Sequence, residues 1–147
     1  MTLMPHRSGA LLLALSATLL PLLASPSPAA ALADPGPLRY HRHGADEITR
    51  FLTSFYGHHG PTPEYRTHRI SQQLKDKQAH SPDADVLLCA QDRPQDISVG
   101  PATVAQAAGV GWATVTTSWG SGAIDTFTAY VRLDSVPIAL DDVICAG

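Results

Sequence analysis

The sequence lacks the features that would identify a nucleic-acid-binding protein or a common class of enzyme. Ten Lys and Arg oppose thirteen Asp and Glu, and the only basic cluster is Arg39-Tyr40-His41-Arg42-His43. Because a nucleic-acid partner needs a basic face, the composition argues against one. The sequence shows no nucleophile–base pair, glycine-rich phosphate loop or nucleotide fingerprint. It therefore predicts no cofactor, and it leans away from an enzyme.

Long hydrophobic runs are also missing, apart from a short one near the N-terminus. This apolar stretch, residues 9–24, is shorter than the roughly 20 residues that a membrane-spanning helix needs, and Pro21 interrupts it. Ala31-Leu32-Ala33 then matches the small-residue pattern of a signal-peptide cleavage site. We therefore expect residues 1–33 to be a cleaved signal peptide, with a retained anchor as the alternative. The protein is expected to be secreted or periplasmic, with no stable membrane span after cleavage.

Cysteine is scarce: the chain contains only Cys89 and Cys145. Neither lies near the expected cleavage site, which disfavours a lipid-anchored lipoprotein. In an oxidising compartment an isolated pair favours one disulfide, which explains these residues more simply than a metal site does. Closing the long loop between Cys89 and Cys145 would stabilise the fold by about 4 kcal/mol in the chain-entropy model, and strain in the bond would reduce that figure.

After the leader, the chain is long enough for one domain. Residues 34–45, with two prolines and two glycines, predict a flexible lead-in, and residues 46–147 predict a single domain. Apolar residues at helical spacing predict a helix over residues 46–56. A second helix is predicted to start at Thr62, with Pro63 as its first residue, and to run toward His80.

The period of the pattern changes to two from Ile97 onward, which predicts strands. Gly120-Ser121-Gly122 predicts a turn, and Asp134-Ser135 predicts a tight hairpin into a last strand that starts at Val136. For Val86–Ala90 a short strand and a helical turn both remain open. Helices followed by an antiparallel meander predict an α+β fold, with two or three N-terminal helices packed on a curved antiparallel sheet of three to four strands.

The last strand contains a conflict in its alternation. An unbroken pattern would bury the Asp142 carboxylate and leave Val143 and Cys145 outside. A β-bulge at Asp141-Asp142 would instead turn Val143 and Cys145 inward, toward Cys89. We favour the bulge because burying an unpaired carboxylate is costly.

Four motifs together resemble a known family. They are Phe51-x-x-x-Phe55-Tyr56-Gly57, Leu87-Leu88-Cys89-Ala90-Gln91-Asp92, Ala113-Thr114-Val115 and Asp142-Val143-Ile144-Cys145. In order and spacing they are similar to domain of unknown function 3828, a family of small bacterial envelope proteins that includes lipoproteins. The resemblance covers about residues 46–145. Where the family tends to carry a Trp in the final strand, this chain has Pro137-Ile138.

The resemblance implies a fold and a compartment but no reaction, because the family has no established activity. The implied fold is a cystatin-like or nuclear-transport-factor-two-like cone, in which helices rest in a bent antiparallel sheet. Such a cone leaves a pocket between the sheet and the helices, and pockets of this kind host enzymes in some relatives.

The preferred functional hypothesis is a non-enzymatic binding module for an unknown protein or small ligand. Trp112 and Trp119 fall on opposite sides of their strand, so we expect one in the core and the other on a binding face. Trp112, Tyr130 and Arg132 are the candidate contact residues, because aromatic and arginine side chains are good anchors. Asp92 is a further candidate, with a cap or turn as its simpler role.

Two alternatives come from other classes. A small isomerase or hydrolase would need a carboxylate and a tyrosine that converge in the pocket. The available groups are Asp92, Asp125, Asp142, Tyr56, Tyr65 and Tyr130, and we expect Tyr56 to fill the core with its hydroxyl at the rim.

A metal-handling protein would use the histidines as ligands. His41 and His43 could combine with Asp46 or Glu47, and His58-His59 forms a second pair. We expect surface histidines instead, because the first pair lies in the predicted lead-in and the second in a loop flanked by glycines.

Overall fold

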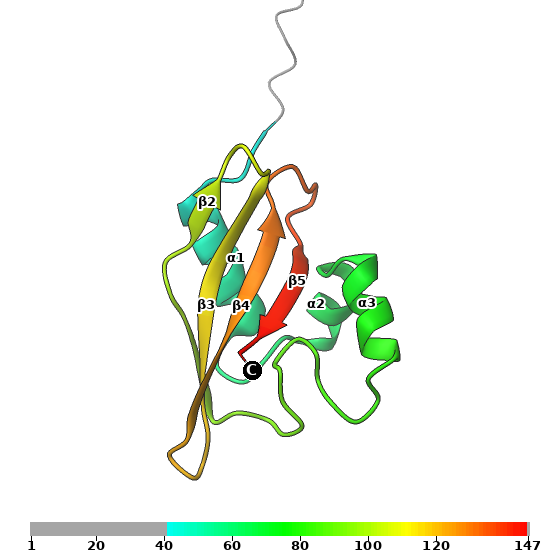
Figure 1. The fold of residues 1–147 in the computed structure, drawn as a ribbon, viewed down its shortest axis with the longest axis vertical. Coiled ribbons are helices and arrows are strands. Elements are labelled where there is room, and N and C mark those ends of the chain that lie inside the picture. Colours follow the sequence, from blue (N-terminus) through cyan, green and yellow to red (C-terminus); the bar gives the residue numbers. More distant parts are fainter. Residues whose placement is uncertain (1–40, 147) are drawn as a thin grey trace, which may run out of the picture. The chain divides into compact units, whose positions relative to one another are not determined.

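The computed structural model describes residues 41–146; the predicted leader and residues 34–40 of the predicted lead-in lie outside this range. The elements in chain order are α1 (Ala45–Tyr56), α2 (Pro63–His68), α3 (Gln72–Ala79), β1 (Asp96–Val99), β2 (Thr103–Ala105), β3 (Val110–Ser118), β4 (Ile124–Arg132) and β5 (Leu140–Cys145) (Figure 1). This order confirms the predicted α+β class. Within residues 41–146, no helix combines the length and apolar character needed to cross a membrane.

The sheet has five strands, so the predicted three to four was too few. All the pairs are antiparallel and the order is β1-β3-β4-β5, with β2 also paired to β3. The strands that raise the number above the prediction are β1 and β2. Both pair with the same edge of β3, and Gly100-Pro101-Ala102 separates them in the chain. Strands of four and three residues are too short to show a clear alternation in the sequence.

Helix α1 forms where it was predicted and covers one face of the sheet, behind β3 and β4 in the view of Figure 1. Its buried residues are Ile48, Phe51, Leu52, Phe55 and Tyr56. They belong to the same core cluster as the inward-facing residues Ala113, Val115, Phe127, Ala129 and Val131 of β3 and β4. A Cβ at Gly111 would collide with Ile48 Cδ1, so this glycine lets the helix lie close to β3.

The predicted second helix is wrong in one respect: it is two helices with a break at Arg69–Ser71. At the break Ile70 forms a parallel bridge with Leu140 of β5. The Ser71 N–H donates to the Leu140 carbonyl at 2.8 Å, and the Leu140 N–H donates to the Arg69 carbonyl at 2.9 Å. Pairing with a strand about seventy residues later therefore interrupts the helix, which a local periodicity cannot reveal.

The predicted bulge in the last strand is confirmed. Tyr130 pairs with Asp142 and Val131 with Leu140, so Asp141 is the extra residue on β5. Beyond the bulge Val143 is 1% exposed and faces the core. Cys145 meets Cys89 as predicted but is exposed at the end of the strand, so its predicted inward position is wrong. The Asp141 carbonyl is not left unpaired, since Ser71 Oγ donates to it at 2.6 Å.

The predicted hairpin at Asp134-Ser135 and the strand from Val136 are wrong. Strand β4 ends at Arg132 and β5 begins at Leu140, so residues 133–139 form a loop. Pro137 has no N–H to donate to a strand partner. The prediction failed because apolar residues alternate in this segment as they do in a strand, although the segment forms no strand in the structure.

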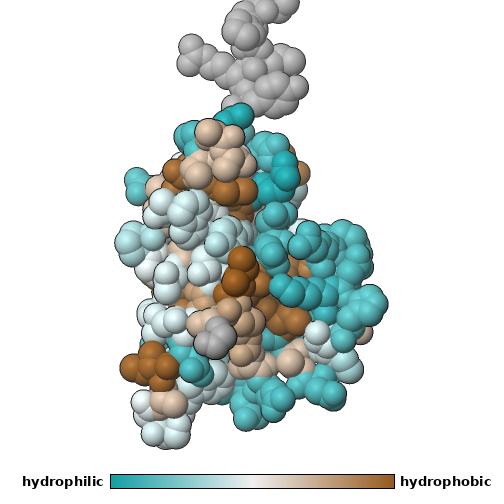
Figure 2. All heavy atoms as spheres, in the orientation of Figure 1, coloured by the Kyte–Doolittle hydropathy of each residue, from teal (hydrophilic) through white to brown (hydrophobic). Residues whose placement is uncertain are grey.

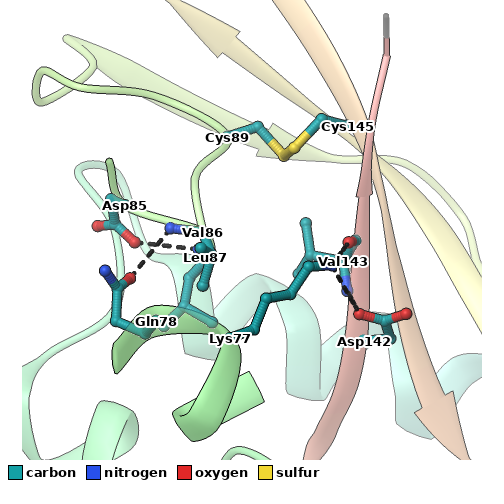
Figure 3. Close-up of a disulfide and its surroundings, with 9 residues drawn as sticks. All are labelled: Lys77, Gln78, Asp85, Val86, Leu87, Cys89, Asp142, Val143 and Cys145. Carbon is teal, nitrogen blue, oxygen red and sulfur yellow. Dashed lines mark hydrogen bonds and ion pairs between the residues drawn. A yellow bond between two sulfur atoms is a disulfide. The ribbon is translucent and has the colours of Figure 1, made fainter. Parts of the chain in front are cut away.

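Residues 86–89 form a hydrogen-bonded turn closed by an isolated bridge between Asp85 and Ala90, and this turn holds one half of the disulfide (Figure 3). The Asp85 N–H donates to the Ala90 carbonyl at 2.7 Å, and the Asp85 carboxylate accepts from the Leu87 N–H at 3.0 Å. Cys89 adopts a φ of 53° within this turn. The predicted pairing is present: Cys89 and Cys145 are joined by a disulfide with their Cα atoms 5.6 Å apart.

The fold predicts a large loss of stability on removal of this disulfide. The double variant Cys89→Ala/Cys145→Ala should lower the free energy of unfolding by about 2–4 kcal/mol, because the bond restricts the unfolded chain over a separation of 56 residues. Urea denaturation monitored by circular dichroism measures the change. A reductant should destabilise the wild-type protein by a similar amount and leave the variant unaffected; equal midpoints for reduced and oxidised wild type would contradict the prediction.

A second prediction concerns Ser71, whose hydroxyl has two structural partners. It accepts from the Leu74 N–H at the start of α3 and donates to the Asp141 carbonyl in the bulge. Ser71→Ala should therefore lower the free energy of unfolding by about 1–2 kcal/mol. Thr62→Ala is the matched control, because Thr62 caps α2 in the same way but is exposed and has no sheet partner. Thermal and urea unfolding should show a smaller loss for the control, and equal losses would refute the second role of Ser71.

Candidate functional site

The face of the sheet opposite α1 is the candidate binding surface. We call it the outer face; it carries Trp112, Thr114 and Thr116 on β3 and Thr126, Thr128, Tyr130 and Arg132 on β4. These residues alternate with the buried positions of both strands. Figure 2 shows that the surface over β3 and β4 is mostly of intermediate hydropathy, whereas hydrophilic residues gather over α2 and α3. The outer face is therefore neither a charged patch nor a large apolar one.

An aromatic pair lies on the outer face. Trp112 and Tyr130 are cross-strand partners, and their ring centroids lie 6.1 Å apart at an interplanar angle of 32°. Both side chains are only half-buried. Thr114 pairs with Thr128 next to them, so hydroxyl groups continue the row along the two strands. The structure thus brings together two of the predicted contact residues.

Arg132 follows Tyr130 by two residues on the same face and is largely exposed. Its Nε lies 3.3 Å from Asp134 Oδ1. Hydrogen bonding to Arg132 lowers the pKa of Asp134, and the same contact raises the pKa of Arg132. The guanidinium is therefore held at the end of β4 with its charge partly balanced.

One of Trp112 and Trp119 was expected in the core, but Trp119 lies just after β3 and is half-buried, as Trp112 is. Neither tryptophan belongs to the buried core cluster. The core expectation for one of them is therefore wrong, because the strand ends at Ser118 and no longer fixes the direction of the next side chain. The Trp119 Nε1 is buried without a hydrogen-bond partner.

Asp92 does not share the outer face with the other predicted contact residues. It is exposed in the segment before β1, where it lines a hollow of about 480 Å³ together with His59, Arg66, Asp85 and Arg93. Arg66 and Asp85 form an ion pair in this hollow. No local pattern in the sequence indicates this hollow, because its lining residues come from separate segments between α1 and β1.

The groups considered for a pocket enzyme are not collected between the helix and the sheet. Tyr56 is fully buried, its hydroxyl has no hydrogen-bond partner, and burial raises its pKa well above the usual value. The expectation of a hydroxyl at the rim is therefore wrong. Asp125 is exposed, and the hydroxyl oxygen of Tyr65 lies 3.0 Å from Ser54 Oγ.

One carboxylate and one tyrosine from this set are neighbours, but not in a pocket. Asp142 pairs with Tyr130 across β4 and β5, on the open outer face. Lys77 Nζ lies 3.2 Å from Asp142 Oδ1 (Figure 3). The carboxylate is therefore paired with a cation on an open face, and it does not converge with a tyrosine inside a pocket.

The two pairs of histidines have different surroundings. His58 is exposed, and its Nδ1 lies 2.8 Å from Asp96 Oδ1; this hydrogen bond lowers the pKa of Asp96. His43, in contrast, is 5% exposed, and its backbone N–H donates to the Leu133 carbonyl at 2.8 Å. The sequence analysis predicted that His43 lies in a flexible lead-in, and this is wrong. No local pattern indicates the hydrogen bond to Leu133, which lies ninety residues later.

Comparisons with protein-family models, with curated proteins and with solved structures found no significant match to this chain. The resemblance to domain of unknown function 3828, and the cone that it implies, therefore stay predictions. The α+β class is shown by the structure itself.

Proposed function

We propose that the protein is an exported binding module without enzymatic activity, and that the outer face of β3 and β4 holds a protein partner. The observation that carries this proposal is the half-exposed pair of Trp112 and Tyr130 on a sheet face that no helix of residues 41–146 covers. A rigid core lies directly beneath this pair, since Ala113 and Ala129 on the same strands are fully buried.

The chemistry of the outer face favours a protein over a small ligand. Tryptophan, tyrosine and arginine are enriched at the centres of protein interfaces, where they contribute most of the binding energy. Small ligands prefer concave pockets that enclose most of their surface, whereas this pair stands on the open face of a sheet. The paired charges of Arg132 and Asp134 add polar contacts without a strong net charge.

Action outside the cytoplasm is supported by the disulfide and by the predicted leader. Disulfides form and persist in oxidising compartments, and Cys89 and Cys145 are both engaged in one. The further proposal of a bacterial envelope protein rests on the sequence resemblance, with which a helix packed on an antiparallel sheet is consistent.

The proposal predicts that a partner is lost when the aromatic pair is removed. The wild-type protein, tagged at its C-terminus and expressed in its host, should capture a specific protein from the envelope or the medium after chemical cross-linking. The variant Trp112→Ser/Tyr130→Ser should reduce the captured amount at least tenfold, since central aromatic anchors each contribute about 2 kcal/mol or more. Quantitative mass spectrometry of the captured proteins measures this.

Thr53→Ala is the matched control, because Thr53 is exposed on α1, which covers the opposite face of the sheet, and the substitution should not alter capture. Circular dichroism and melting curves establish that all the variants are folded. Equal capture by the wild type and the double variant would overturn the proposed surface. A melting shift caused by a small molecule from the host, with no captured protein, would overturn the proposed class of partner.

A further inference from the structure

The start of the described chain brings three side chains with metal-binding atoms together. His41 Nε2 lies 3.3 Å from Glu47 Oε2, and His43 Nδ1 lies 2.8 Å from Glu47 Oε1. One ligand atom from each residue lies within 4.8 Å of the other two. Glu47 belongs to the first turn of α1, while the histidines precede the helix. The beginning of α1 thus holds the carboxylate against both imidazoles.

His43 is held in a fixed orientation by the loop that follows β4. Its side chain is 6% exposed, and its Nε2 lies 2.7 Å from the Ser135 carbonyl oxygen. Because a carbonyl only accepts, Nε2 must carry the proton and donate it, which leaves a lone pair on Nδ1 in the neutral ring. Metal-bound histidines show this arrangement: the second ring nitrogen donates to a carbonyl or carboxylate and fixes the ring.

The Nδ1 atom of His43 lacks the partner that a buried polar atom normally has. It is fully buried and makes no hydrogen bond, because Glu47 Oε1 is near it but outside hydrogen-bond geometry. An unsatisfied buried polar atom is destabilising, because it has lost its hydrogen bonds to water without replacing them. A cation seated between Nδ1 and the carboxylate would remove this cost and would also engage His41.

The neighbouring charges permit a cation at this position. Arg42, between the two histidines, is turned to another partner: its guanidinium donates to the Gln106 carbonyl at 2.9 Å. Among residues 41–146, the ion-pair partners of the Glu47 carboxylate are the two histidines, so no Lys or Arg competes with a cation for it.

We propose that His41 Nε2, His43 Nδ1 and the Glu47 carboxylate bind a divalent zinc ion. Two imidazoles and one carboxylate form a donor set that suits zinc and leaves a fourth position open. Ligand atoms around a tetrahedral zinc lie about 3.4 Å apart. When the ion enters, His43 Nδ1 and Glu47 Oε1, which are 2.8 Å apart, must separate slightly, and any pair wider than this spacing must close. His41, with 69% of its side chain exposed, is free to rotate toward the other two residues. This proposal does not depend on the proposed function of the outer face.

Titration with zinc alone tests the proposal. The protein, purified from its host without a histidine tag and stripped with a chelator, should bind one equivalent of Zn²⁺ in isothermal titration calorimetry and gain thermal stability from it. Glu47→Gln keeps the shape of the side chain and should weaken zinc binding at least tenfold. His41→Ala should do the same, and both substitutions lie at partly or largely exposed positions that the fold tolerates.

His58→Ala is the matched control, because His58 is exposed and outside the cluster. Its zinc affinity should equal that of the wild type. A Co²⁺-loaded sample gives an independent readout: visible absorption bands of a tetrahedral site should appear in the wild type and disappear in His41→Ala. The proposal is overturned if zinc binding survives both Glu47→Gln and His41→Ala, if it is lost in His58→Ala, or if the wild type binds no zinc.

Discussion

The attachment of β5 to the segments on both sides of it is the constraint on which the rest of the structure depends. Strand β5 pairs with β4 on one side, while on the other Ile70 and Ser71 pair with Leu140. Lys77 Nζ donates to the Val143 carbonyl at 3.0 Å, and the disulfide closes the far end at Cys145. The unpaired groups of this edge strand are thus engaged within the chain, which protects the edge from pairing with another chain.

Within residues 41–146, the inner face and the β5 edge of the sheet are both covered by other parts of the chain, whereas the outer face is left open. The inner face is filled by α1, and the β5 edge is covered by the break between α2 and α3. The two proposed sites lie on surfaces that these contacts leave uncovered. The aromatic pair stands on the outer face over the rigid centre of the sheet, and the proposed zinc ligands lie where the start of α1 meets the loop after β4. In both places a packed element behind the side chains fixes their direction, as a binding site requires.

The sequence predicted the parts of the fold that depend on local patterns. The spacing of Ile48, Phe51 and Phe55 was enough for α1, and the cost of burying Asp142 was enough for the bulge and the inward turn of Val143. What it could not predict depends on distant partners. The helix break arises from Leu140, the burial of His43 arises from Leu133 and Ser135, and the separation of Asp92 from Trp112 arises from the path of the loop before β1. The i, i+4 spacing of His43 and Glu47 was the one local signal of their contact.

The most direct test is the intact mass of the protein. The protein is isolated from its host without reductant, and its free thiols are blocked with an alkylating reagent. This mass tests whether the chain is exported and joined by a disulfide between Cys89 and Cys145. The account predicts a chain that begins at Asp34, lacks two hydrogens relative to the dithiol form and carries no alkyl group. A mass with two alkyl groups, or one that retains residues 1–33, would contradict it.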